Sequence, residues 1–221
     1  MKLFLDTANL KEIEEVNAWG VLDGVTTNPT LLATEAAPGK DYRQMLKEIC
    51  AEVDGAVSAE VVSTDTDGMI REAKELVQIA DNIYVKFPCT PAGLAACKAV
   101  RAEEIRVNMT LVFSPAQTLL AAKAGANFIS PFLGRIDDVA SGGMEILSQC
   151  IEIVKNYDFS SEILASSLRG PMHVVEAARL GSDIATMPHK VFTQLVEHPL
   201  TDIGLKRFID DWEKARKDLG A

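Results

Sequence analysis

A regular alternation of short apolar runs with helical patterns limits how this chain can fold more than any other feature. Runs of strand length recur about every 20–35 residues, and a helical pattern follows each run. The eight runs are Leu3–Asp6, Gly24–Asn28, Ala56–Val62, Ile83–Phe87, Arg106–Val112, Phe128–Phe132, Ile163–Ser167 and Asp183–Met187. Because a helix separates each strand from the next, we expect parallel strands joined by right-handed crossovers.

Helix boundary signals agree with this alternation. Proline occupies the first predicted helical position after Thr90, Ser114 and Gly170, where its missing N–H costs no hydrogen bond. Gly125 and Gly181 then stand where a helix C-cap is expected. The helices predicted from these signals are Met69–Ile79, which Asp65 and Asp67 precede, Ala92–Arg101, Ala116–Ala124 and Met172–Leu180.

Eight β/α units predict an α/β fold, a single (β/α)8 TIM barrel domain over residues 1–221. The alternative is an open doubly wound sheet, which usually carries a glycine-rich loop after its first strand; here Asp6-Thr7-Ala8-Asn9 follows instead. Residues 199–221 are predicted to add a C-terminal helix. Within Thr201–Leu219, an apolar stripe either packs on the barrel's own surface or contacts another subunit; it contains Phe208, Ile209 and Trp212.

The acidic composition argues against several classes of partner. A formal net charge of -10 repels nucleic-acid backbones and anionic membranes, and no basic patch is visible. No apolar stretch approaches the length of a membrane span or a secretion signal. The cysteines lack CxxC spacing and the histidines lack metal-ligand spacing; these residues are Cys50, Cys89, Cys97, Cys150, His173, His189 and His198. We therefore expect a cytoplasmic protein with reduced thiols and no metal site.

Polar residues interrupt seven consecutive predicted strands near their C-terminal ends, where barrels of this type carry their active sites. One strand-end Asn or Thr is more often a turn or cap group, but seven strands with this feature indicate a shared pocket. Pairs within a strand are two residues apart and so face the same side. The residues are Asp6, Thr26, Asn28, Ser58, Glu60, Lys86, Asn108, Thr110, Ser130 and Ser167, with Phe132, Arg135 and Arg169 just after strand ends.

Lys86 is the most informative of these residues, because it lies in the apolar run Ile83–Phe87. A lysine inside a barrel loses hydration, and this would depress its pKa. A neutral amine attacks carbonyls to give an iminium ion, which withdraws electrons so that a neighbouring carbon–carbon bond can break. The alternative is a structural ion pair with Glu60 or Asp6.

The remaining charged candidates suit the same chemistry. Schiff-base formation and bond cleavage need proton transfers, and Glu60 and Asp6 are the carboxylates expected at the mouth on early strands. Arg135 and Arg169 follow adjacent strands and can converge on a phosphate. The alternative for Arg135 is pairing with the acidic residues that follow it, Asp137 or Asp138.

Six motifs together resemble those of the small transaldolases and the related fructose-6-phosphate aldolases, over essentially the whole chain. The most specific are Thr26-Thr27-Asn28-Pro29 and the block Ser130–Asp137. The others are Phe4–Ala8, Val85–Pro88, Asn108–Val112 and Ala165–Arg169.

The resemblance implies a role for each candidate residue. Lys86 corresponds to the Schiff-base lysine, Glu60 to an acid/base acting through a water that Thr110 helps to hold, and Asp6 to the group that handles the C4 hydroxyl proton. Asn28, Asn108 and Ser130 are implied to bind the dihydroxyacetone part, and Arg135, Ser167 and Arg169 the phosphate. It further implies no cofactor, phosphorylated sugar substrates, and a homo-oligomer, a pentamer or decamer, with the C-terminal helix in the contacts.

Two positions separate the activities within this family. Fructose-6-phosphate aldolases typically carry glutamine at the position of Glu60 and tyrosine at that of Phe132, so this chain resembles the transaldolases. The implied reaction transfers dihydroxyacetone from sedoheptulose 7-phosphate or fructose 6-phosphate to an aldose phosphate in the pentose phosphate pathway. An aldolase that releases free dihydroxyacetone and a non-catalytic phosphosugar-binding barrel are the alternatives.

Overall fold

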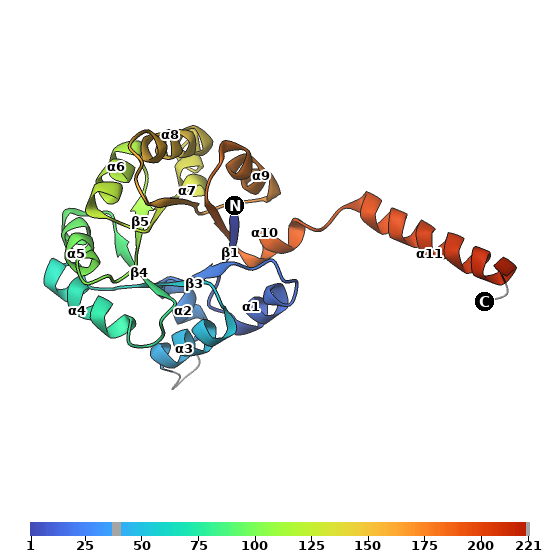
Figure 1. The fold of residues 1–221 in the computed structure, drawn as a ribbon, viewed down its shortest axis with the longest axis horizontal. Coiled ribbons are helices and arrows are strands. Elements are labelled where there is room, and N and C mark those ends of the chain that lie inside the picture. The colour runs from blue at the N-terminus through green and yellow to red at the C-terminus, as the bar shows by residue number, and fades with distance from the viewer. Residues whose placement is uncertain (37–40, 220–221) are drawn as a thin grey trace.

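The structure, a computed structural model, describes residues 1–36 and 41–219 and contains a closed barrel of eight parallel strands (Figure 1). Each strand pairs with the next, and β8 pairs with β1, with Lys2 opposite Ile184. The strands are β1 Lys2–Asp6, β2 Gly24–Thr26, β3 Ala56–Glu60, β4 Ile83–Pro88, β5 Val107–Val112, β6 Phe128–Pro131, β7 Glu162–Ala165 and β8 Ile184–Met187. The predicted barrel is confirmed, and the open sheet is wrong.

The described helices surround the barrel in Figure 1, except the C-terminal helix, which extends away from it. They are α1 Leu10–Asn17, α2 Pro29–Glu35, α3 Tyr42–Glu52, α4 Thr66–Leu76, α5 Pro91–Arg101, α6 Pro115–Ala124, α7 Leu133–Asp137, α8 Gly143–Asn156, α9 Pro171–Leu180, α10 His189–Gln194 and α11 Pro199–Leu219. The Thr90 and Ser114 side chains cap α5 and α6, and Gly125 and Gly181 are left-handed, with φ of +88° and +86°. Helix α4 begins three residues before its predicted start, because Asp65 accepts a hydrogen bond from Gly68 N at 2.8 Å as its N-cap.

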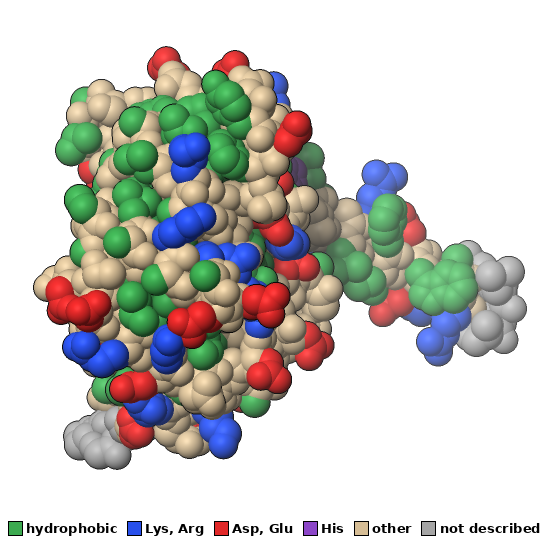
Figure 2. All heavy atoms as spheres, turned by 60° about the vertical axis from the view of Figure 1, so that its left-hand side comes forward, with side chains coloured by type: hydrophobic (Ala, Val, Ile, Leu, Met, Phe, Trp, Pro, Cys, Tyr) green, Lys and Arg blue, Asp and Glu red, His purple; other side chains and the backbone are tan. Residues whose placement is uncertain are grey.

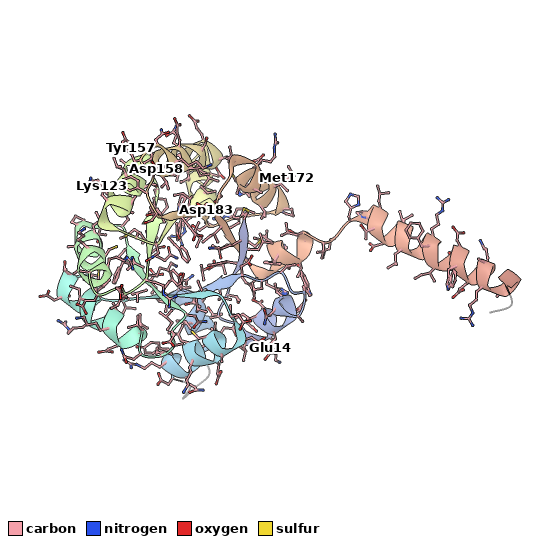
Figure 3. All side chains as sticks on the ribbon, viewed as in Figure 1. Glu14, Lys123, Tyr157, Asp158, Met172 and Asp183 are labelled. Carbon is pink, nitrogen blue, oxygen red and sulfur yellow. The ribbon has the colours of Figure 1, made fainter. Side chains whose placement is uncertain are left out.

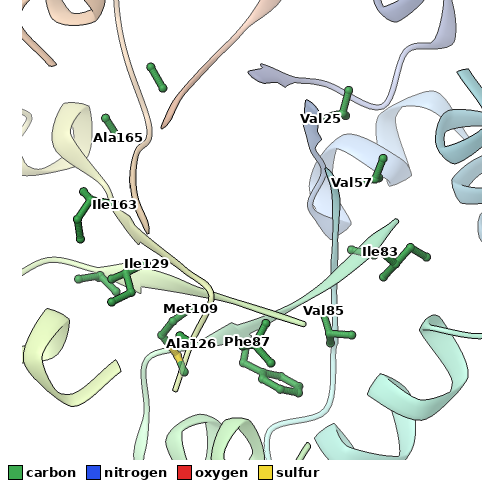
Figure 4. Close-up of a cluster of buried hydrophobic side chains, with 14 of the residues drawn as sticks. Val25, Val57, Ile83, Val85, Phe87, Met109, Ala126, Ile129, Ile163 and Ala165 are labelled. Atoms are coloured by element: carbon green, nitrogen blue, oxygen red, sulfur yellow. The ribbon is translucent and has the colours of Figure 1, made fainter. Parts of the chain in front are cut away.

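Side chains alternate between two faces of the closed sheet, except at an irregularity near the end of β5. Val25, Val57, Val85, Met109 and Ile129 belong to the large buried cluster outside the strands, where they pack under the helices (Figure 4). The residues between them point into the barrel, where those of β1, β3, β4, β6, β7 and β8 form or pack against a second, separate core.

The N-terminal half of the barrel interior is filled by aromatic and aliphatic side chains. The ring of Phe128 stacks on Tyr84 at 4.3 Å and meets Phe4 edge-on at 6.0 Å. Leu164 and Ile184 complete this buried cluster. Two residues further along the strands, roughly 6–7 Å toward their C-terminal ends, the inward positions become polar.

Helix α11 projects away from the barrel (Figures 1 and 3), and its hydrophobic side chains are visible on the arm in Figure 2. Phe208 and Trp212 are 72% and 62% exposed, and Ile209 is 49% exposed. The interpretation that this stripe packs on the barrel's own surface is therefore wrong. None of the helices in the described ranges combines the length and apolarity needed to cross a membrane.

We expect the packing of the Phe4 ring inside the barrel to require glycine at position 24. A Cβ atom there would lie 2.6 Å from the Phe4 ring and 2.6 Å from the carbonyl oxygen of Ala56. We predict that Gly24→Ala lowers the free energy of unfolding by about 1–3 kcal/mol, measured by urea denaturation. The control is Gly204→Ala in the exposed helix α11, where no atom lies within 4 Å and alanine should not destabilise. Equal stability of Gly24→Ala and the wild type would contradict this packing argument.

Candidate active site

A polar pocket of about 210 Å³ opens at the C-terminal ends of the strands. All of the predicted site residues except Ser58, Glu60 and Thr110 line it. Its lining consists of Asp6, Thr26, Asn28, Lys86, Asn108, Ser130, Phe132, Arg135, Leu164, Ser166, Ser167, Leu168, Arg169, Thr186 and Pro188. A shared pocket is present: six of the seven predicted strands contribute to its lining, β3 does not, and β8 adds to it through Thr186.

Lys86 enters the pocket from β4 and is 5% exposed. Its Nζ lies 2.9 Å from Oε2 of Glu60 on the neighbouring strand and donates a hydrogen bond to the carbonyl oxygen of Thr27 at 3.1 Å. The ion pair left open by the sequence is thus the geometry found. Because the amine also lines the pocket, the pair places a carboxylate directly beside a nucleophile rather than removing it from a ligand's reach.

Glu60 occupies the boundary between two pockets. Its carboxylate faces Lys86, and it also lines an apolar pocket of about 460 Å³ with Leu32, Tyr42 and Leu76. Glu60 thus contacts Lys86 without lining the polar pocket itself.

Asn108 is held by hydroxyl groups on both sides. Ser130 Oγ donates to Asn108 Oδ1 at 2.7 Å, and Asn108 Nδ2 donates to Ser58 Oγ at 3.0 Å. The amide is therefore fixed in one orientation on the barrel floor.

Thr110 behaves differently from its neighbours. Its Oγ1 is the one buried side-chain polar atom without a hydrogen-bond partner in the part of the chain that the structure describes. The next residue, Leu111, has φ of +54°, and the register of β5 with β6 shifts between Met109 and Val112. A buried hydroxyl without a partner is costly, and the hydrogen-bonding capacity of Thr110 Oγ1 is one that no described residue satisfies.

Asp6 is the carboxyl group among the residues that line the pocket. Burial raises its pKa above the ordinary value, while the positive charge of Lys86 and a hydrogen bond from Thr26 oppose the rise. Thr26 Oγ1 donates to Asp6 Oδ1 at 2.7 Å.

Two arginines line the side of the pocket formed after β6 and β7. The guanidinium of Arg135 lies 5.3 Å from the centre of the Phe132 ring, and Arg169 pairs with Asp138 at 2.7 Å. Among the described residues Arg135 pairs with neither Asp137 nor Asp138, so that alternative is wrong and Asp138 contacts the other arginine. Both guanidinium groups line the pocket with Ser167 and can bind an anion there.

A close backbone contact aligns these two loops. Gly134 N donates to the carbonyl oxygen of Ser167 at 3.1 Å, and a Cβ at Gly134 would lie 2.1 Å from that oxygen. Ser167 itself has φ of +59°. The glycine therefore allows the loop that carries Arg135 to lie against the loop that carries Arg169.

Sequence reasoning missed Ser166 and Thr186 as pocket residues. Both follow a buried aliphatic residue of the barrel interior by two positions, Leu164 and Ile184 respectively. The alternation of inward and outward positions contains the signal for both residues. In these two strands a polar residue is paired with an apolar one, whereas most of the other strands carry two polar residues or a charged one.

These features define a class of protein: a (β/α)8 barrel with a buried lysine paired to a glutamate, and with two arginines at the rim of its mouth. The family model described as "Transaldolase/Fructose-6-phosphate aldolase" matches residues 3–219, and the chain belongs to this family.

Relatives of similar length support this membership. The chain is 54% identical over 214 residues to a probable transaldolase of Aquifex aeolicus, which covers 97% of each chain. It is 51% identical over 220 residues to a probable transaldolase of Kosmotoga olearia, covering 100% of both. A probable transaldolase of Thermus thermophilus is 54% identical over 222 residues, covering 98% of this chain and 100% of the relative.

The raised pKa of Asp6 gives a stability prediction. The folded carboxyl retains its proton at pH values above 3.8 at which the unfolded one has lost it, so stability falls as pH rises through this window. At neutral pH the buried carboxylate is therefore unfavourable. Asp6→Asn should raise the melting temperature at pH 7, with a smaller gain near pH 4.

Thermal unfolding over a pH series measures this effect. Asp81→Asn at an exposed carboxylate is the control and should leave the melting temperature unchanged. A lower melting temperature for Asp6→Asn at pH 7 would show that the ionised group stabilises the fold.

Proposed function

We propose that this chain is a transaldolase, which transfers a dihydroxyacetone unit from sedoheptulose 7-phosphate or fructose 6-phosphate to an aldose phosphate through a lysine Schiff base. This is a reaction of the pentose phosphate pathway. The observation that carries the proposal is the 2.9 Å contact between Glu60 and Lys86, whose side chain lines the polar pocket, in a chain from this family. The names of the relatives support the same activity.

In the first half-reaction Lys86 and Glu60 form the Schiff base. Glu60 accepts a proton from the lysine ammonium, and the neutral amine attacks the ketose carbonyl to give a carbinolamine. Glu60 returns the proton to the carbinolamine hydroxyl, which leaves as water when the iminium forms. Thr110, with its unpartnered buried hydroxyl, is suited to hold the water that carries these protons.

Carbon–carbon cleavage then requires a second carboxylate. Asp6 accepts the proton of the C4 hydroxyl, the C3–C4 bond breaks, and its electron pair passes to the iminium to give an enamine and a free aldehyde. An acceptor aldehyde reverses these steps: the enamine carbon attacks it, and Asp6 gives the proton to the new hydroxyl. Water finally releases the product ketose from Lys86. The iminium is itself the electron sink, so this chemistry uses no metal or organic cofactor.

The pocket residues divide between the two ends of the substrate in this proposal. Asn28, Asn108 and Ser130 bind the dihydroxyacetone hydroxyls, because they offer amide and hydroxyl groups next to Lys86. Arg135, Ser167 and Arg169 bind the phosphate at the opposite rim.

Transfer is favoured over net aldol cleavage by Glu60 and Phe132. Phe132 lines the pocket and has no hydroxyl that could protonate the enamine and release free dihydroxyacetone. The enamine therefore persists until an aldehyde acceptor arrives.

A trapping experiment tests the covalent step. Borohydride reduction with fructose 6-phosphate should leave a stable adduct on Lys86, located by peptide mass spectrometry, and Lys86→Met should form none. Lys123→Met on the outer helix α6 is the control and should trap like the wild type. Binding of fructose 6-phosphate without an adduct on Lys86 would favour the non-catalytic barrel instead.

An acceptor test separates the transferase from the lyase. Fructose 6-phosphate alone should release dihydroxyacetone at less than about a tenth of the rate at which erythrose 4-phosphate accepts it. Glu60→Gln should lower kcat by about 10²-fold or more, because proton transfer at the carbinolamine is lost. Release without acceptor at the rate of transfer would identify an aldolase.

We further propose that the chain is a cytoplasmic homo-oligomer, a pentamer or decamer, built from one barrel domain with α11 as its contact arm. The exposed Phe208 and Trp212 support this, because large apolar side chains on a projecting helix are suited to burial against another subunit. The four free cysteines suit a reducing compartment.

Charge substitution on this stripe tests the assembly. Phe208→Asp with Trp212→Asp should convert the oligomer to monomers in sedimentation velocity, because carboxylates cannot be buried in an apolar contact without large cost. Lys206→Asp with Lys214→Asp, on the opposite side of α11, is the control. An unchanged sedimentation coefficient in the first variant would exclude this contact.

A further inference from the structure

Three side chains from adjacent strands form a hydrogen-bonded chain on one wall of the pocket. Thr186 Oγ1 on β8 lies 2.7 Å from Thr26 Oγ1 on β2, and Thr26 Oγ1 lies 2.7 Å from Asp6 Oδ1 on β1. Both threonines are 3% exposed. The strand between them, β1, carries the carboxyl at the end of the chain.

The direction of this chain follows from counting hydrogens. A threonine hydroxyl has one hydrogen to donate. Thr26 donates its hydrogen to the Asp6 carboxylate, which has none to give when ionised. The hydrogen between the two threonines must then come from Thr186. Thr186 therefore donates to Thr26, and Thr26 donates to Asp6.

We propose that Thr186 is a positioning residue, which holds the Thr26 hydroxyl so that its hydrogen points at Oδ1 of Asp6 and leaves Oδ2 toward the substrate. Oδ2 has no hydrogen bond to another residue in the described part of the chain. The effect of Thr186 on the Asp6 carboxyl follows from this geometry alone. The effect of Thr186 on turnover rests on the proposed function.

A space-filling role would not need this hydroxyl. Valine has nearly the shape of threonine, and the interior positions below this level are apolar. Among the described residues Thr26 is the hydrogen-bond partner of the buried Thr186 hydroxyl, so the polar group has a specific contact rather than a solvent one.

The chain bears on the ionisation of Asp6. A hydroxyl that accepts a hydrogen bond becomes a stronger donor, and donation to a carboxylate favours its charged form. Removal of the Thr186 hydroxyl should therefore raise the pKa of Asp6 beyond the increase that burial causes. The charged groups facing the same pocket are Lys86 with its partner Glu60, and Arg135 and Arg169 at the rim, and none is altered by a change at Thr186.

Two variants isolate the hydroxyl. Thr186→Val removes it while keeping the shape, and Thr186→Ser keeps it. The infrared band of the protonated Asp6 carboxyl, assigned by its absence in Asp6→Asn, is followed against pH in the intact protein. We expect the midpoint to rise by about half a pH unit in Thr186→Val and to stay at the wild-type value in Thr186→Ser. Thr118→Val, a buried threonine of α6 that contacts Cys150, is the control and should not shift it.

Kinetics give the corresponding functional result. The acidic limb of kcat/KM for donor cleavage should move up by the same half unit in Thr186→Val, which is about a threefold loss well below the limb. The plateau above the limb should stay unchanged, and Thr186→Ser should restore the profile. A purely structural role would lower the plateau without moving the limb.

The outcomes separate this inference from the proposed function. Identical infrared midpoints in Thr186→Val and the wild type would overturn it, as would a shift of equal size in Thr186→Ser. If the wild type forms no Schiff base and transfers nothing, the proposed function fails, and the infrared titration still decides the role of Thr186.

Discussion

The pairing of β8 with β1 closes the sheet, and the pocket depends on that closure. In a closed parallel barrel every second side chain of each strand points to a common axis, so residues far apart in the chain meet there. Asp6 and Thr186 contact the same threonine although they come from the two ends of the barrel sequence. An open sheet would leave these two strands at opposite edges and would divide the polar wall.

Much of this arrangement could be predicted from the sequence because it follows from alternation. The position of Lys86 in an apolar run placed its amine inside, and Asp6, Asn108 and Ser130 followed from the same spacing. The partners of these groups could not be predicted. Whether Lys86 pairs with Glu60 or with Asp6 depends on the register between strands, which the pattern within one strand does not contain. Asp138 contacts Arg169 rather than Arg135 for a similar reason, because the loops after β6 and β7 meet through Gly134.

The C-terminal helix shows a different limit. An amphipathic pattern indicates that a helix has an apolar face, but it does not say whether that face packs on its own domain. Among the described residues, Phe208 and Trp212 are largely exposed. The apolar face of α11 therefore lies uncovered on an extended arm. Thr186 was missed because its strand partner Ile184 is apolar, so no polar pair drew attention to that strand.

The aromatic packing inside the barrel affects how substrates enter and products leave the pocket. Phe4, Tyr84 and Phe128 pack across the interior, and among the described residues they close the N-terminal side of the pocket. In the proposed reaction the first aldehyde must then leave by the same mouth through which the second enters. Because both aldehydes use this one opening, the first must depart before the second arrives. The packing of the core therefore leads to double-displacement kinetics.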